Sequence, residues 1–92
     1  MLEKDLEKKL RICVKGMGGI ALKFVSPGFS GVPDRLVLMP SGRLYFVELK
    51  ARGSKLRPLQ VKRKAQLEKL GFLVYCVGSL DELEVFLEEV RD

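Results

Sequence analysis

Two carboxylates and a lysine near the middle of the chain have the residue types for metal-assisted chemistry: Asp34, Glu48 and Lys50. Two carboxylates held close together repel each other and stay protonated unless a cation lies between them. Hard cations such as Mg²⁺ prefer oxygen ligands. A cation bound there lowers the pKa of a water molecule and stabilises negative charge on a phosphate, and a lysine beside it can orient that water or neutralise developing charge. If the fold brings the three residues together, they predict phosphodiester hydrolysis. The alternative is a set of exposed charges on one strand surface.

A β-hairpin is the element that must position them. Segments 34–39 and 43–50 are rich in Val, Leu, Tyr and Phe, and Pro40-Ser41-Gly42 separates them. If these three residues form the turn, paired residue numbers sum to 82, and Asp34 lies directly opposite Glu48 on the same face. Lys50 shares that face because side chains alternate along a strand. A two-residue turn would shift the register by one and separate the two carboxylates.

The other elements follow from hydrophobic spacing and turn residues. Leucines recur at helical spacing over residues 2–15, and glycines follow. Pro58 suits the first position of a second helix, which continues to Gly71. Ser79 and Glu82 match a capping box before a last helix. Short apolar runs predict strands at 20–25 and 72–77, with loops at 26–33 and 51–57. The order is α-β-β-β-α-β-α, which predicts one α/β domain over residues 1–92, a four-stranded mixed sheet flanked by helices.

Composition excludes several classes of protein. The chain has a net charge of +5 and 92 residues, a length that is too short for a second domain. It contains no histidine, so histidine-dependent triads and histidine metal sites are excluded, and its two cysteines cannot form a zinc site alone. No apolar run approaches the ~20 residues of a membrane span, and the charged N-terminus lacks a signal-peptide core. We therefore expect a cytoplasmic protein with no membrane partner.

Basic residues concentrate directly after the candidate trio. Seven bases and no acid lie between Lys50 and Lys64, whereas residues 79–92 hold six acids and one base. Such a block predicts a polyanionic partner, for which nucleic acid is the first candidate. The alternative is a solvated face that only confers solubility.

Longer strings around the trio resemble a known family. Pro33-Asp34 followed by Glu48-Leu49-Lys50 is similar to the PD-(D/E)xK nuclease signature, which alone is a weak pattern. Together with Lys23-Phe-Val-Ser-Pro-Gly28, Gly31-Val-Pro-Asp-Arg35, Phe46-Val-Glu-Leu-Lys-Ala51 and Leu56-Arg-Pro-Leu-Gln60, it resembles the virus-type replication-repair nuclease domain, VRR-NUC. The resemblance covers nearly the whole chain and implies a restriction-endonuclease-like fold.

The resemblance also implies roles for matching positions. Asp34, Glu48 and the backbone carbonyl of Leu49 would bind Mg²⁺ or Mn²⁺, and Lys50 would be the catalytic lysine. Gln60 would lie near the third position of the second long helix and support the site. The first helix of such nucleases donates a glutamate, for which Glu7 aligns better than Glu3. Relatives often have a capping serine where this chain has Arg57, which cannot cap by accepting a hydrogen bond; Arg57 is expected to contact phosphate instead.

The resulting expectation is a metal-dependent endonuclease that leaves a 5′-phosphate and needs no small-molecule cofactor. Small standalone relatives are similar to homodimeric junction resolvases, so we expect a homodimer acting on branched DNA, in a bacterial cell or a phage-infected host. A flap or general nicking endonuclease is the alternative within the enzyme class. Two further alternatives lie outside the enzyme class: a non-catalytic nucleic-acid-binding module and an interaction subunit of a larger nuclease. The residues expected to contact DNA are Lys23, Arg52, Lys55, Arg57, Lys62 and Arg63.

Overall fold

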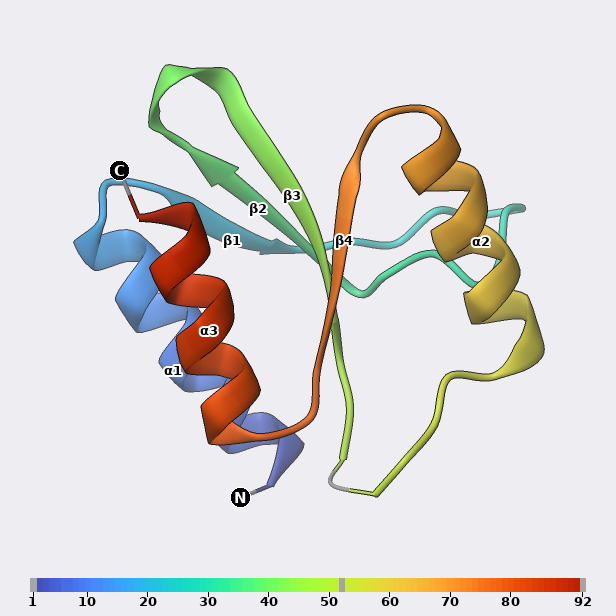
Figure 1. The fold of residues 1–92 in the computed structure, drawn as a ribbon, viewed down its shortest axis with the longest axis horizontal. Helices are drawn as coiled ribbons and strands as arrows, with labels where there is room; N and C mark the ends of the chain where they lie inside the picture. The colour runs from blue at the N-terminus through green and yellow to red at the C-terminus, as the bar shows by residue number, and fades with distance from the viewer. Residues whose placement is uncertain (1, 52, 92) are drawn as a thin grey trace.

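The computed structural model describes residues 2–51 and 53–91 and has the predicted order of elements. Within these residues no helix is long and apolar enough to cross a membrane. In chain order the elements are α1 (Glu3–Gly16), β1 (Ile20–Lys23), β2 (Arg35–Met39), the 3-10 turn η1 (Pro40–Gly42), β3 (Arg43–Leu49), α2 (Pro58–Lys69), β4 (Leu73–Val77) and α3 (Leu80–Val90) (Figure 1).

The four strands form one mixed sheet, as predicted. Their spatial order is β1-β2-β3-β4; β1 and β3 run antiparallel to β2, and β4 runs parallel to β3. β1 ends at Lys23 instead of Val25. Phe24 still donates its backbone N–H to the carbonyl of Asp34 at 2.8 Å, but the following proline and glycine cannot extend the ladder. The chain then crosses in a loop to β2.

The hairpin between β2 and β3 has the predicted three-residue turn. Met39 pairs with Arg43 and Arg35 pairs with Val47, so paired residue numbers sum to 82. Ser41 and Gly42 have φ angles of 68° and 73°, the left-handed conformation that closes the turn. Extended by one pair, this register places Asp34 across from Glu48.

Helices α1 and α3 cover one face of the sheet and bury the core (Figure 1). Leucines of α1 at spacings of four residues meet the inward residues of the central strands and Phe86 of α3. Ser79 caps α3 by accepting the Glu82 backbone N–H at 3.1 Å, as the capping box predicted. The core side chains with no exposed surface are Leu6, Leu10, Val14, Val37, Val47, Leu83 and Val90.

Helix α2 lies on the opposite face, where it contacts β4 (Figure 1). It leaves the half of this face near the hairpin turn uncovered. Cross-strand pairs such as Ile20 with Leu38 and Leu22 with Leu36 put apolar side chains there, and Ile20 is 55% exposed. We call this surface the open face; its side chains are Ile20, Leu22, Leu36, Leu38, Leu44, Phe72 and the buried Phe46, whose ring contacts Phe72.

Candidate active site

The structure brings Asp34, Glu48 and Leu49 together at the end of the hairpin away from its turn. The backbone N–H of Asp34 donates to Oε1 of Glu48 at 3.1 Å. The backbone N–H of Leu49 donates to Oδ1 of Asp34 at 3.0 Å. Each carboxylate is therefore held by the backbone of the opposite strand. The predicted register thus produces a pair of adjacent carboxylates.

Burial makes this pair costly to ionise. Burial raises the pKa of Asp34 above its ordinary value, against the opposing effects of the Leu49 N–H and the Arg35 guanidinium. Burial also raises the pKa of Glu48, and the Asp34 carboxylate raises it further, whereas Lys50 opposes the shift. Glu48 is only 8% exposed. Two desolvated carboxylates with raised pKa values form the environment that a divalent cation stabilises, so the donor set fits Mg²⁺ or Mn²⁺.

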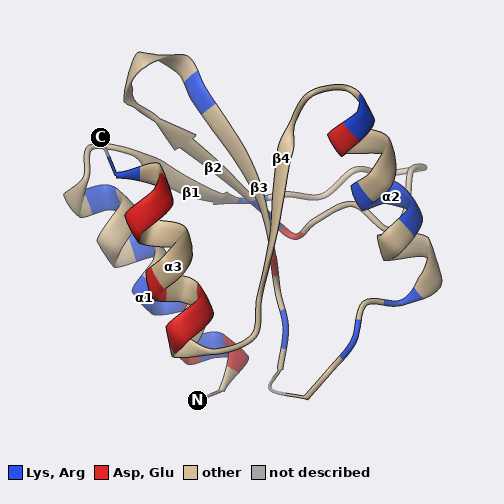
Figure 2. Cartoon of the chain, viewed as in Figure 1, with Lys and Arg blue, Asp and Glu red and all other residues tan. Residues whose placement is uncertain are grey.

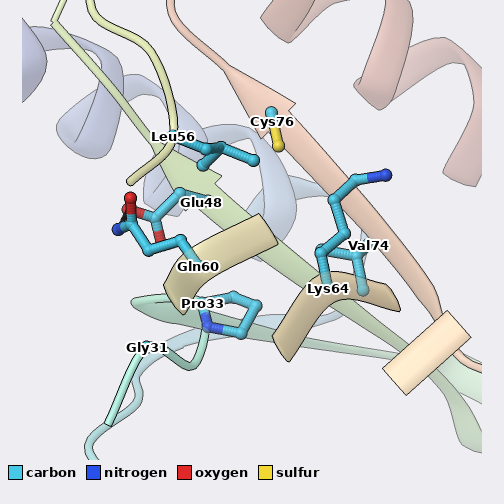
Figure 3. Close-up of a pocket in the computed structure, with 8 residues that line it drawn as sticks. All are labelled: Gly31, Pro33, Glu48, Leu56, Gln60, Lys64, Val74 and Cys76. Atoms are coloured by element: carbon cyan, nitrogen blue, oxygen red, sulfur yellow. Dashed lines mark hydrogen bonds between the residues drawn. The ribbon is translucent and has the colours of Figure 1, made fainter. Parts of the chain in front are cut away.

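Gln60 joins the pair to the first turn of α2, and it lies at the third position of that helix, as predicted. Its Nε2 donates to Oε2 of Glu48 at 3.0 Å, and both side chains are buried (Figure 3). Its Oε1 accepts the backbone N–H of Arg57 at 2.8 Å. The amide of Gln60 therefore supplies one half of a capping box, and Arg57 has no acceptor to supply the other half.

Lys50 extends the same network. Its Nζ donates to the carbonyl of Lys55 at 2.6 Å and to Oε1 of Gln60 at 3.4 Å. The ammonium is thus held by the loop before α2 and by the same amide that contacts Glu48. Four predicted site residues, Asp34, Glu48, Lys50 and Gln60, form one hydrogen-bonded group.

The structure does not bring Glu7 into this hydrogen-bonded group, so its role as a metal ligand stays a prediction. Glu7 forms ion pairs with Arg11 and, at 3.3 Å, with Arg35. Glu3, one turn earlier on α1, is the helix carboxylate whose charge raises the pKa of both Asp34 and Glu48. In the described part of the chain, no three acidic or thiol side chains lie close enough to hold a metal ion. Among the described residues, the hydrogen-bonded group therefore contains two carboxylates, and Glu7 pairs with arginines outside it.

Most of the predicted DNA-contacting residues are exposed. Lys23 ends β1, and Lys55, Arg57 and Lys62 follow the loop and the first turns of α2. Figure 2 shows that basic residues predominate along this loop and α2, whereas acidic residues predominate on α3 at the opposite side of the sheet. Arg52 lies outside the described residues. The charge separation predicted from the sequence thus corresponds to two separate surfaces.

Arg63 differs from the other bases because its guanidinium is turned onto the protein. Its Nε donates to the carbonyl of Ser30 at 2.7 Å, and one terminal nitrogen donates to Oε1 of Gln66 at 2.9 Å. The guanidinium also lies 3.8 Å from the ring centre of Phe29. Phe29 and Ser30 belong to the loop before Asp34, and nothing in the sequence pattern links them to Arg63.

A small cavity beside Glu48 and Gln60 has mostly apolar walls. Its volume is about 10 Å³, room for about one water molecule. Cys76 is one wall, opposite Glu48 in the β3–β4 register, and burial raises the pKa of its thiol. Glu48 therefore borders a small, mostly apolar cavity. The lining residues are Gly31, Pro33, Glu48, Leu56, Gln60, Lys64, Val74 and Cys76 (Figure 3).

Comparisons with known proteins agree with the geometry. The chain is 51% identical over 79 residues to "Putative nuclease p44" of Acyrthosiphon pisum secondary endosymbiont phage 1, a match that spans 86% of this chain and 85% of that protein. A solved structure described as a VRR_NUC domain superimposes with a TM-score of 0.89 at 31% identity and covers 96% of each chain. No protein-family model matches the chain.

Proposed function

The chain belongs to the VRR-NUC family of nucleases, and from this premise we propose that it is a Mg²⁺- or Mn²⁺-dependent endonuclease that hydrolyses phosphodiester bonds in DNA. The observation that supports this proposal most strongly is the pair of desolvated carboxylates, Asp34 and Glu48, with Lys50 and Gln60 bonded around it.

Asp34, Glu48 and the carbonyl of Leu49 would hold the cation. In a strand, the N–H and C=O of one residue point to the same neighbouring strand, and the N–H of Leu49 points to Asp34. A divalent cation held there would lower the pKa of a water molecule and stabilise negative charge on the phosphate.

The protein's own residues orient the reacting groups. Gln60 fixes Oε2 of Glu48, and the Asp34 N–H fixes Oε1, so the carboxylate cannot rotate away. Lys50 holds its proton donors beside the pair, where they can orient water and neutralise charge on a phosphate oxygen. The exposed bases Lys55, Arg57 and Lys62 belong to the loop and first turns of α2, which also carries Gln60, and would contact neighbouring phosphates.

Branched DNA cut by a homodimer is the finer part of the proposal, and the open face supports it. This face is apolar, and none of its seven side chains is charged. Two copies with a net charge of +5 can approach there without opposing like charges. A patch that meets its own copy about a two-fold axis is self-complementary by construction. A dimer would carry two sites, one for each strand of a branch.

Cleavage assays test the enzymatic proposal directly. Labelled four-way junction, flap, duplex and single-stranded DNA are incubated with Mg²⁺, Mn²⁺ or EDTA. We expect metal-dependent cutting of the junction and its loss in Asp34→Asn and Lys50→Met. Cutting should be retained in Lys15→Met, which makes the same change as Lys50→Met at an exposed residue of α1. Preferential cutting of the flap would favour the flap endonuclease. Binding without cutting under either metal would refute the enzyme and favour a binding module.

Sedimentation tests the dimer separately. We expect wild type to sediment as a dimer and Leu22→Glu, on the open face, to sediment as a monomer. The matched control is Val85→Glu on α3, a 59% exposed apolar residue on the other side of the sheet, which should leave the dimer intact. A monomeric wild type at micromolar concentration would refute the dimer and leave the nuclease proposal standing.

A further inference from the structure

The loop between β1 and β2 carries the chain into Asp34, and few backbone bonds hold it. Phe24 donates to the carbonyl of Asp34 at 2.8 Å, and Phe29 donates to the carbonyl of Ser26 at 3.1 Å. Further support comes from α2. Arg63 bonds the Ser30 carbonyl and places its guanidinium against the Phe29 ring.

Gly31 shows how closely this loop approaches α2. A Cβ atom at Gly31 would lie 2.7 Å from Cγ of Leu59, 2.9 Å from the Leu59 carbonyl oxygen and 3.0 Å from Cγ of Arg63. Its φ of +88° is also a conformation that glycine adopts readily and other residues avoid. Backbone packing and the arginine therefore fix the loop on the same two turns of the helix.

Helix α2 thus contacts Glu48 and the loop that leads into Asp34. Gln60 bonds Glu48 directly. Arg63, three residues later on the same side of the helix, bonds Ser30, four residues before Asp34. One rigid element therefore sets the position of Glu48 through Gln60 and the path of the chain into Asp34 through Arg63.

We propose that Arg63 is a positioning residue for the metal site, which aligns Asp34 with Glu48 by holding Phe29 and Ser30, and that it is not primarily a DNA contact. This inference rests on the proposed metal-dependent function. The planar guanidinium is required because a lysine cannot both stack on the ring and keep a fixed fork of donors. Outer residues that orient metal ligands typically change metal affinity 10–100-fold when they are replaced.

The test compares Arg63→Gln and Arg63→Lys with Lys62→Gln, which removes an exposed base at the adjacent position. Mn²⁺ affinity is measured by calorimetry on the DNA-free protein. We expect both Arg63 variants to bind Mn²⁺ about tenfold more weakly and Lys62→Gln to bind it as wild type does. In DNA binding without a cleaving metal, Lys62→Gln should lower the salt slope by about 1, whereas Arg63→Gln, which removes the same charge, should leave it unchanged. Phe29→Leu, which leaves all charges in place, should weaken Mn²⁺ binding in the same direction as Arg63→Lys.

Amide hydrogen exchange supplies a readout that needs neither metal nor DNA. The Asp34 N–H is bonded to Glu48, so release of the loop should speed its exchange in the Arg63 variants and leave the β3–β4 amides protected. Wild-type Mn²⁺ affinity and unchanged Asp34 exchange in Arg63→Gln would overturn the inference. If wild type itself binds no Mn²⁺, the proposed function fails, and the exchange measurement still decides whether Arg63 positions Asp34.

Discussion

Replacing Asp34 with asparagine should separate the chemical role of this carboxylate from its structural role. An asparagine oxygen can still accept the Leu49 N–H that Asp34 accepts at 3.0 Å, and the backbone N–H of residue 34 still donates to Glu48. The substitution therefore keeps the hydrogen bonds and removes one desolvated charge. Without metal, we expect the melting temperature of Asp34→Asn to equal or exceed that of wild type.

Metal should reverse this order. A cation at 100 times its Kd stabilises the folded state by about 2.7 kcal/mol. In a domain of this size, 1 kcal/mol shifts Tm by about 4–8 °C, so wild type should gain roughly 10–20 °C. Asp34→Asn should gain little. The assay is thermal unfolding followed by circular dichroism, with and without Mn²⁺.

Glu48→Gln provides the structural contrast. Both oxygens of Glu48 accept hydrogen bonds, from the Asp34 N–H and from Nε2 of Gln60. A glutamine offers one acceptor, so one buried donor loses its partner at a cost of about 1–3 kcal/mol. We therefore expect a lower Tm without metal in Glu48→Gln only. A clear loss of metal-free stability in Asp34→Asn, or a full metal-induced gain in it, would refute the reasoning.

The raised pKa values of Asp34 and Glu48 also fix the sign of the pH dependence. The metal-free folded state binds protons more tightly than the unfolded chain at these two sites. Their contribution to stability is present below the ordinary carboxylate pKa and is lost as pH rises through the raised values. Metal binding has the opposite sign, because protons compete with the cation. Unfolding of the metal-free protein measured from pH 4 to pH 8 should show this loss of stability with rising pH in wild type, and a smaller loss in Asp34→Asn.

The remaining predictions concern the elements around the pair. Gln60→Ala removes the bond to Glu48 and the cap of α2, so urea unfolding should show a loss of about 1–3 kcal/mol; a loss below 0.5 kcal/mol would mean that α2 begins without this amide. Gly31→Ala should destabilise the protein more than Gly28→Ala, since both residues have positive φ but a Cβ at Gly28 meets nothing within 4 Å; equal losses would show that the close approach to Leu59 yields. EDTA should abolish cleavage, and added Mn²⁺ should restore it; cutting that persists in EDTA would argue against metal dependence.

Local patterns predicted the center of the site because its geometry is local. The turn at Pro40–Gly42 and the alternation of side chains are enough to place Asp34 opposite Glu48, and helix numbering from Pro58 is enough to place Gln60. The choice between Glu3 and Glu7 depended on how α1 is rotated about its axis against the sheet. In the structure this rotation places Glu7 beside Arg35 of β2. Such a rotation is decided by tertiary packing, which residue spacing does not specify.

Two other features depended on contacts between distant parts of the chain. Arg63 bonds Ser30 across 33 positions, and an arginine on a helix ordinarily faces solvent. Cys76 lies beside Glu48 only because β4 runs parallel to β3 in one register. Two parallel strands joined through a helix have no tight turn to set their register. The sequence alone therefore could not predict that Cys76 lies beside Glu48 or that Arg63 bonds Ser30.

The hairpin turn also limits how the number of residues between Asp34 and Glu48 can change during evolution. Asp34 and Glu48 are 14 positions apart, and they face each other because the turn between their strands contains three residues. Adding or removing one residue in each strand preserves their opposition, whereas a single insertion in one strand moves one carboxylate to the other side of the sheet unless a bulge absorbs it. We therefore expect active descendants of this sequence to change the spacing in steps of two, and odd changes to coincide with a bulge or a rebuilt turn.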